Sequence, residues 1–107
     1  MPIPDMTHLQ FLILGTLLDG EKSGQQVRDE LAKNRVKKSG PAFYQLMARL
    51  EDAKFVKGHY DEKVIDGQRI KERRYVVTGG GVRAWQRTRE FYQSFAMKSL
   101  PGGLAHA

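Results

Sequence analysis

The sequence predicts a mainly α-helical domain with one small β-hairpin, which is an α+β fold. Helical spacing is clearest in the segment 39–52, where apolar residues recur at intervals of three and four: Phe43, Leu46, Met47 and Leu50. A hairpin is indicated by Asp66-Gly67 between two runs with apolar and aromatic ends. Both positions of a two-residue hairpin turn need positive φ, which Asp-Gly tolerates.

The length and charge of the chain limit its class. Its 107 residues suit one compact domain, and its net charge of +6 favours anionic partners such as nucleic acid or an acidic membrane surface. The lack of cysteine excludes disulfides, thiolate zinc sites and cysteine nucleophiles, and it fits a cytoplasmic setting. The apolar run 9–18 is too short to cross a bilayer and lacks signal-peptide flanks, so no membrane partner is expected.

Two helices are expected before residue 34. Thr7 can cap the first, which runs to about Leu18 and carries apolar residues on two faces. A helix that is apolar on both sides is buried on both sides, either by a second subunit or within the monomer alone. Ser23 and Gln26 have the spacing of a capping box that opens a second helix over 24–33.

The helix over 39–52 follows a basic linker and has Pro41 in its first turn, where the missing N–H is not needed. Its opposite face carries Gln45 and Arg49, and Lys37 and Lys38 lie just upstream. A short amphipathic helix with positive flanks can lie in a DNA groove. An ordinary surface helix with solvated charges explains the same segment equally well.

Two strands are expected over 55–65 and 68–77. The outer part of this hairpin is basic, with Lys63, Arg69, Lys71 and Arg73. Flexible cations on a hairpin can neutralise DNA phosphates. The alternative is a charged edge strand that prevents aggregation, and the neighbouring basic helix region favours phosphate contact.

The last helix is expected from about Val82 to Leu100, after a cap at Thr78 and before Pro101-Gly102-Gly103. It is long and aromatic and would leave a large apolar patch in water. Such a patch usually marks an interaction surface, and dimerisation is the simple interpretation. Residues 1–78 would then form a DNA-binding region, and residues 79–107 a dimerisation helix and tail.

The order of three helices, a hairpin and a long helix predicts a winged helix-turn-helix with a C-terminal dimerisation helix. In this arrangement the helix over 39–52 is the recognition helix and the hairpin is the wing.

These residues resemble the PadR-like transcriptional regulators over roughly residues 11–92. PAFYQLMARLE at 41–51 retains several positions of that family's recognition helix: Tyr44, Arg49, Leu50 and Glu51. RRYVVTGGG at 73–81 retains positions of its second wing strand: Arg73, Arg74, Tyr75, Thr78 and Gly81. Gln25, Pro41 and Ala42 depart from the family pattern, and the insertion around 63–70 makes this wing longer than usual.

The resemblance implies a homodimeric repressor that binds a pseudo-palindromic operator in double-stranded DNA, with two recognition helices about 34 Å apart. Tyr44 and Ser39 suit phosphate oxygens, and Gln45 could contact a base edge. The candidate DNA-binding residues are Lys37, Lys38, Ser39, Gly40, Tyr44, Gln45, Arg49, Lys63, Arg69, Lys71 and Arg73.

Some relatives bind flat aromatic effectors between their subunits. In this chain Phe11, Trp85, Tyr92 and Phe95 could line such a site, or they could be dimer core.

Other function classes are less well supported. His8, His59 and His106 are far apart and form no metal motif, and no phosphate-binding glycine loop is present, so no enzyme activity, metal or cofactor is expected. The alternative is a winged helix that binds another protein without specific DNA binding.

Overall fold

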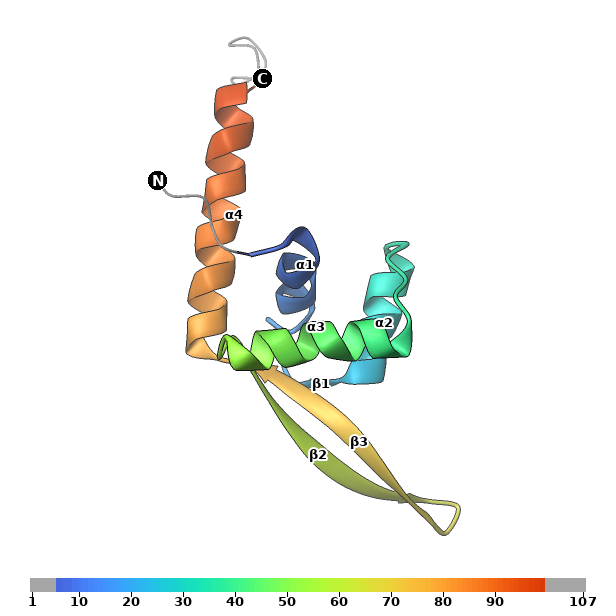
Figure 1. The fold of residues 1–107 in the computed structure, drawn as a ribbon. Coiled ribbons are helices and arrows are strands. Elements are labelled where there is room, and N and C mark those ends of the chain that lie inside the picture. Colours follow the sequence, from blue (N-terminus) through green and yellow to red (C-terminus); the bar gives the residue numbers. More distant parts are fainter. Residues whose placement is uncertain (1–5, 100–107) are drawn as a thin grey trace.

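The computed structural model describes residues 6–99 and has the predicted α+β fold (Figure 1). Four helices and three strands follow one another along the chain. They are α1 (His8–Thr16), β1 (Lys22–Ser23), α2 (Gly24–Lys33), α3 (Gly40–Asp52), β2 (Val56–Ile65), β3 (Gln68–Val77) and α4 (Gly79–Ser99). The wing, formed by β2 and β3, projects from one side of the helices, and α4 extends in another direction (Figure 1).

Local capping starts the first three helices. Thr7 and Ser23 each form a capping box with the glutamine three residues later, Gln10 and Gln26. The Ser39 hydroxyl accepts a hydrogen bond from the Ala42 N–H at 3.3 Å, with Pro41 in the first turn as predicted. The predicted ends are less accurate, because α1 ends at Thr16 rather than near Leu18.

The core lies between the first three helices and the base of the sheet. Its completely buried residues include Ile13, Leu14, Leu17, Val27, Phe43, Met47 and Leu50. Within α1 itself, Ile13 and Leu14 are buried, whereas Leu9, Phe11 and Leu12 are only partly buried by the single chain. Leu18, where this helix was predicted to end, remains 39% exposed.

The sheet has the order β1-β3-β2, with both pairings antiparallel. Asp66 and Gly67 have φ of 52° and 77°, which confirms the predicted two-residue turn. Ten residue pairs, from Val56 with Val77 to Ile65 with Gln68, join β2 to β3. The short strand β1 occupies a segment where the sequence indicated only a turn and a cap, and it pairs with Tyr75 and Arg74.

Helix α4 begins at Gly79, three residues before the predicted start at Val82. The Thr78 hydroxyl caps it by accepting the Gly81 N–H at 3.0 Å, and the same hydroxyl donates to the Lys54 carbonyl at 2.7 Å. A Cβ on Gly81 would overlap the Phe55 carbonyl oxygen. Glycine is therefore needed where this helix passes the base of the wing. The predicted helix end at Leu100 and the tail 101–107 lie outside the described residues.

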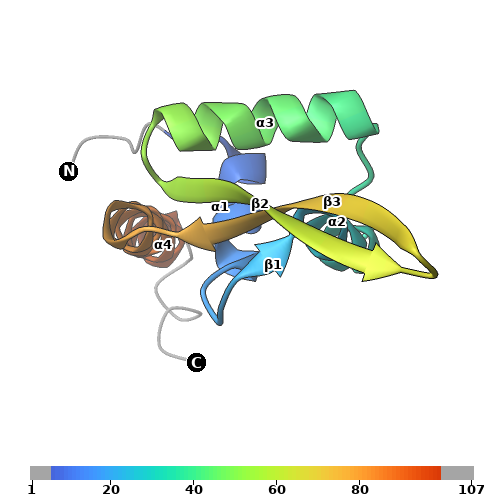
Figure 2. The same cartoon turned by 90° about the horizontal axis from the view of Figure 1, so that it is seen from below.

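Two views place α3 beside the wing. Figure 2 shows α3 along one side of the hairpin, while α4 starts at the hairpin base. The angle between α3 and the wing is where the candidate site lies.

Candidate nucleic-acid interface

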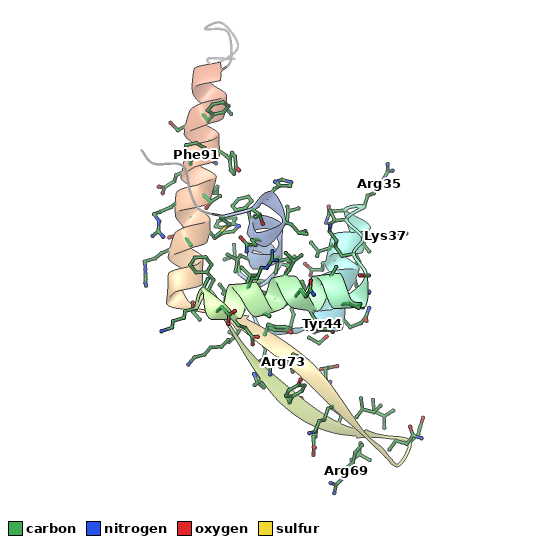
Figure 3. The ribbon with its side chains drawn as sticks, viewed as in Figure 1. Arg35, Lys37, Tyr44, Arg69, Arg73 and Phe91 are labelled. Carbon is green, nitrogen blue, oxygen red and sulfur yellow. The ribbon has the colours of Figure 1, made fainter. Side chains whose placement is uncertain are left out.

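Helix α3 and the wing enclose an open notch of about 620 Å³. It is lined by Tyr44, Glu51, Tyr60, Lys71, Arg73 and Tyr75. Figure 3 shows Tyr44 on α3 and Arg73 on the wing at this angle. The notch therefore brings together residues from the helix and the hairpin, the two segments that were each predicted to contact DNA.

Side chains of a strand alternate between its two faces, and residues paired directly across a hairpin share a face. The pairs Tyr60 with Arg73, Glu62 with Lys71 and Val64 with Arg69 therefore lie on one side of the wing. Because Tyr60, Lys71 and Arg73 line the notch, this is the side that faces α3, and we call these six residues the near face. Three predicted cations thus lie together: Arg69, Lys71 and Arg73.

Lys63 lies on the other side of the wing. It is paired with Ile70, so its side chain shares a face with His59, Glu72 and Arg74, which we call the far face together with Lys63. Its ammonium group is 3.4 Å from Glu72 Oε1. The structure therefore does not bring Lys63 together with the other three predicted wing cations.

The far face carries a network of ion pairs that reaches the turn before β1. Arg74 donates to Glu21 at 2.8 Å and to Glu72 at 2.7 Å. His59 Nε2 lies 3.5 Å from Glu21 Oε1. The hydrogen bond from Arg74, together with Lys63, holds the pKa of Glu72 below its usual value. The charges of this face are therefore largely satisfied within the chain.

Arg73 is held in place on the near face. Its Nη2 donates to Glu51 Oε1 at 2.5 Å, and its guanidinium lies over the rings of Tyr60 at 4.7 Å and Tyr75 at 5.8 Å. Burial alone would lower the pKa of Arg73, but the hydrogen bond and charge of Glu51 outweigh it and raise that pKa. Burial raises the pKa of Tyr75 to about 12, so this phenol is neutral at ordinary pH.

Tyr44 is partly packed and partly exposed. Its ring meets Phe43 edge-on at 5.0 Å, and 40% of its surface remains accessible. A Cβ on Gly24 would lie 2.6 Å from the Tyr44 hydroxyl oxygen. Gly24 therefore leaves the space in which Tyr44 reaches the notch, which gives a physical reason for glycine at this position.

The other predicted residues of this region lie around the start and outer side of α3. Gln45 and Arg49 are exposed, and with Lys38 they border a shallow groove floored by Leu9 and Leu46. Figure 3 places Lys37 with Arg35 on the α2–α3 loop, on the opposite side of α3 from the wing. Ser39 uses its hydroxyl as the helix cap, and Gly40 is the first residue of α3.

Three of the four predicted effector or dimer residues lie together: the Phe11 ring contacts Trp85 and meets Tyr92 edge-on at 6.1 Å, whereas Phe95 lies further along α4. Phe11 and Trp85 stack at 5.4 Å with their planes 10° apart, so each fills the space beside the other. Tyr92 and Phe95, further along α4, are 45% and 61% exposed. The first half of α4 packs on α1, where Trp85 stacks on Phe11, whereas its second half presents aromatic rings to solvent.

Within residues 6–99, no cluster of three or more histidine, aspartate or glutamate side chains could hold a metal ion. Across the same residues, no helix combines the length and apolar character needed to span a membrane.

No family model matches the chain, and a comparison with curated proteins finds no match either. Solved structures do match. A PadR-family regulator from Clostridium difficile R20291 superposes with a TM-score of 0.73 at 14% identity, covering 84% of this chain and 92% of that one. The chain has the PadR winged-helix fold.

Two more PadR structures show the same likeness. A PadR-family transcriptional regulator from Eggerthella lenta gives a TM-score of 0.70 at 20% identity, covering 82% of this chain and 74% of that one. Bacillus subtilis PadR in complex with operator DNA gives 0.62 at 22% identity, covering 81% of this chain and 48% of that one. These matches confirm the resemblance to the PadR fold inferred from the sequence motifs.

Proposed function

We propose that this protein is a DNA-binding transcriptional regulator of the PadR type. The observation that carries the proposal is the near face, where Arg69 and Lys71 lie on the side of the wing that faces α3, while Arg73 on the same side is paired with Glu51. Cations that lie together on one surface are typical of a protein that binds the phosphate backbone of a nucleic acid. The match to a PadR structure that contains operator DNA supports the same function.

In this proposal, α3 enters the major groove and the near face follows the adjacent backbone. Gln45 and Arg49 are exposed on α3 and suit base edges or nearby phosphates. The Tyr44 hydroxyl and the cations of the near face suit phosphate oxygens, which position the protein without specifying sequence.

We further propose that the protein acts as a homodimer through the second half of α4. Phe91 and Phe95 stack on one another at 6.3 Å, and Phe95 and Tyr92 are largely exposed. Aromatic side chains dominate the energetics of interfaces, and an exposed row of them is unfavourable in water. Two protomers related by a twofold axis would bind a pseudo-palindromic operator and act as a repressor.

The dimer is tested by sedimentation of the wild-type protein and of Phe95→Lys. The wild type should sediment as a dimer and the variant should shift toward the monomer, with unchanged helix content. Gln93→Lys, an exposed position on the same helix, is the matched control. A monomeric wild type would exclude this part of the proposal.

A flat aromatic effector is proposed to bind beside Trp85 and Tyr92. The chain has a single tryptophan, so its fluorescence reports this place directly. Saturable quenching by a panel of flat aromatic compounds, lost in Tyr92→Ala while the dimer persists, supports an effector site. If no compound in a broad panel gives saturable quenching, these residues serve as dimer core only.

DNA binding is tested by fluorescence anisotropy with duplexes tiled across the region upstream of the gene, with excess random DNA and a salt titration. If one duplex remains bound in the presence of the random DNA, with two protomers per duplex, the result supports a specific dimeric regulator. A DNA complex with several phosphate contacts should lose affinity by orders of magnitude between 50 and 200 mM salt. Absence of binding at low salt would favour the alternative, a winged helix that uses the exposed α4 aromatics to bind another protein.

A further inference from the structure

Glu51 joins the helix of the notch to the wing. Its carboxylate accepts the 2.5 Å hydrogen bond from Arg73, and both side chains are about one quarter exposed. The two residues are 22 positions apart, one on α3 and one on β3. The ion pair therefore crosses the notch between the two elements that are proposed to contact DNA.

The surroundings of this ion pair allow it little freedom. Gly58 lies beneath it on β2, and a Cβ there would lie 2.7 Å from Arg73 Nη2 and closer still to Glu51 Oε1. The Tyr60 and Tyr75 rings flank the guanidinium plane. A planar guanidinium that is stacked and ion-paired loses orientations that a lysine ammonium would keep. The pair is thus a defined strut rather than a surface contact between mobile side chains.

A strut at this position controls the outer wing. Five further residue pairs, from Asp61 with Glu72 to Ile65 with Gln68, extend beyond the pair of Tyr60 and Arg73. At the rise of a strand this is about 17 Å, so a rotation of roughly 10° at the strut moves the tip by about 3 Å. The position of Arg69 relative to α3 therefore depends on the strut.

The strut also determines which cations can meet phosphates. Among the described residues, Lys71 and Arg69 form no ion pair, whereas Arg73 is neutralised by Glu51. A carboxylate on a DNA-facing surface repels phosphates, so Glu51 weakens binding to any duplex while it orders the wing.

We propose that Glu51 is a positioning and specificity-determining residue. Through Arg73 it sets the angle between α3 and the wing, and it withholds one cation from sequence-independent phosphate binding. The proposal rests on the proposed DNA-binding function, but its positioning part is measurable without DNA.

The first test measures a distance that depends on the angle between α3 and the wing. The chain has no cysteine, so Ala48→Cys on α3 and Gln68→Cys at the wing tip, both exposed positions, accept spin labels without background. Pulsed electron–electron double resonance should give one narrow distance distribution in the doubly labelled protein with Glu51 intact. The distribution should be broader or shifted after Glu51→Gln. Asp52→Asn, the same charge change at the next residue, is the matched control and should leave the distribution narrow.

The second test measures DNA affinity and its salt dependence. Glu51→Gln should bind random duplex about threefold or more tightly at low salt, with a log–log salt slope steeper by about 0.9, because Arg73 gains one phosphate contact. Its preference for the operator over random DNA should fall. Asp52→Asn should keep the wild-type slope and preference, and Glu51→Asp should lie between the wild type and Glu51→Gln.

The outcomes separate the proposals. An unchanged distance distribution in Glu51→Gln overturns the positioning role, and an unchanged salt slope and operator preference overturn the specificity role. If the wild-type protein binds no DNA, the proposed function fails and the specificity role fails with it. The spin-label result then decides the positioning role alone.

Discussion

The two faces of the wing use the same strands in different ways. The near face meets α3 at its base through the Glu51–Arg73 pair, which lies against Gly58, and Tyr44 of α3 borders the same notch beside Gly24. The far face holds its charges through exposed ion pairs around Arg74. Arg73 and Arg74 are neighbours in sequence, yet strand alternation sends them to opposite sides.

This difference shows that the number of basic residues in a hairpin does not define an interface. Lys63 and Lys71 are both cations of the outer wing, and the sequence assigned them the same role. Lys63 lies beside Glu72 on the far face, whereas Lys71 lies over the Tyr60 ring in the notch. Placement and pairing decide which charges can meet a phosphate.

The packing of Tyr44 beside the notch can be disturbed by filling the space at Gly24. In Gly24→Ala the new Cβ would lie 2.6 Å from the Tyr44 hydroxyl oxygen, so the ring must move. Overpacking of this kind destabilises by about 1–3 kcal/mol, which urea unfolding would measure. Gln25→Ala, at an exposed site in the same turn, should change stability by less than about 0.5 kcal/mol. Equal effects of the two variants would contradict the tight fit.

The contributions of cations on the near and far faces of the wing can be compared by measuring DNA binding of alanine variants. Replacing Arg69 and Lys71 together by alanine should reduce the salt slope by about 1.8 and weaken affinity roughly tenfold at low salt. Lys63→Ala should change both quantities much less, because its charge lies on the far face beside Glu72. A salt slope as strongly reduced in Lys63→Ala would show that the wing meets DNA in another orientation.

The far face should contribute little to folding. Arg74→Ala removes the hydrogen bonds to Glu21 and Glu72, and ion pairs that are screened by solvent contribute little to stability. We expect the free energy of unfolding to fall by less in Arg74→Ala than in Gly24→Ala, with an unchanged salt slope of DNA binding. A loss of stability larger than that of Gly24→Ala would mean that this network anchors the wing.

The smallest effect is expected in the pH dependence of stability. Arg74 holds the pKa of Glu72 below its ordinary value of 4.5 in the folded protein. Glu72 therefore stabilises the folded state above about pH 4.5, and this contribution is lost as pH falls through the lower, folded-state pKa. The stability difference between the wild type and Glu72→Gln should be complete at pH 7 and shrink below pH 4.5. A difference that does not shrink as the pH falls below 4.5 would have another cause.

Much of the local structure was predictable from the sequence. Thr7, Ser23 and Ser39 cap helices through contacts three residues away, and Asp66-Gly67 forms its turn from its own backbone preferences. The register set by that turn, combined with strand alternation, was also a signal that could have separated Lys63 from Arg69, Lys71 and Arg73. The motifs around Tyr44 and Arg73 indicated the fold, which brings α3 and β3 together at the notch.

The remaining features depend on contacts between distant residues. The strand β1 exists because Lys22 and Ser23 meet Tyr75 and Arg74, and α4 starts early because Gly81 fits against Phe55. The pairing of Glu51 with Arg73 likewise requires α3 and β3 to be packed together. By itself, the sequence determined the helices, the turn and the basic character of the wing, since these follow from interactions within a few residues. Only the tertiary structure decided which charges face α3 and which are neutralised, because that depends on which elements lie side by side.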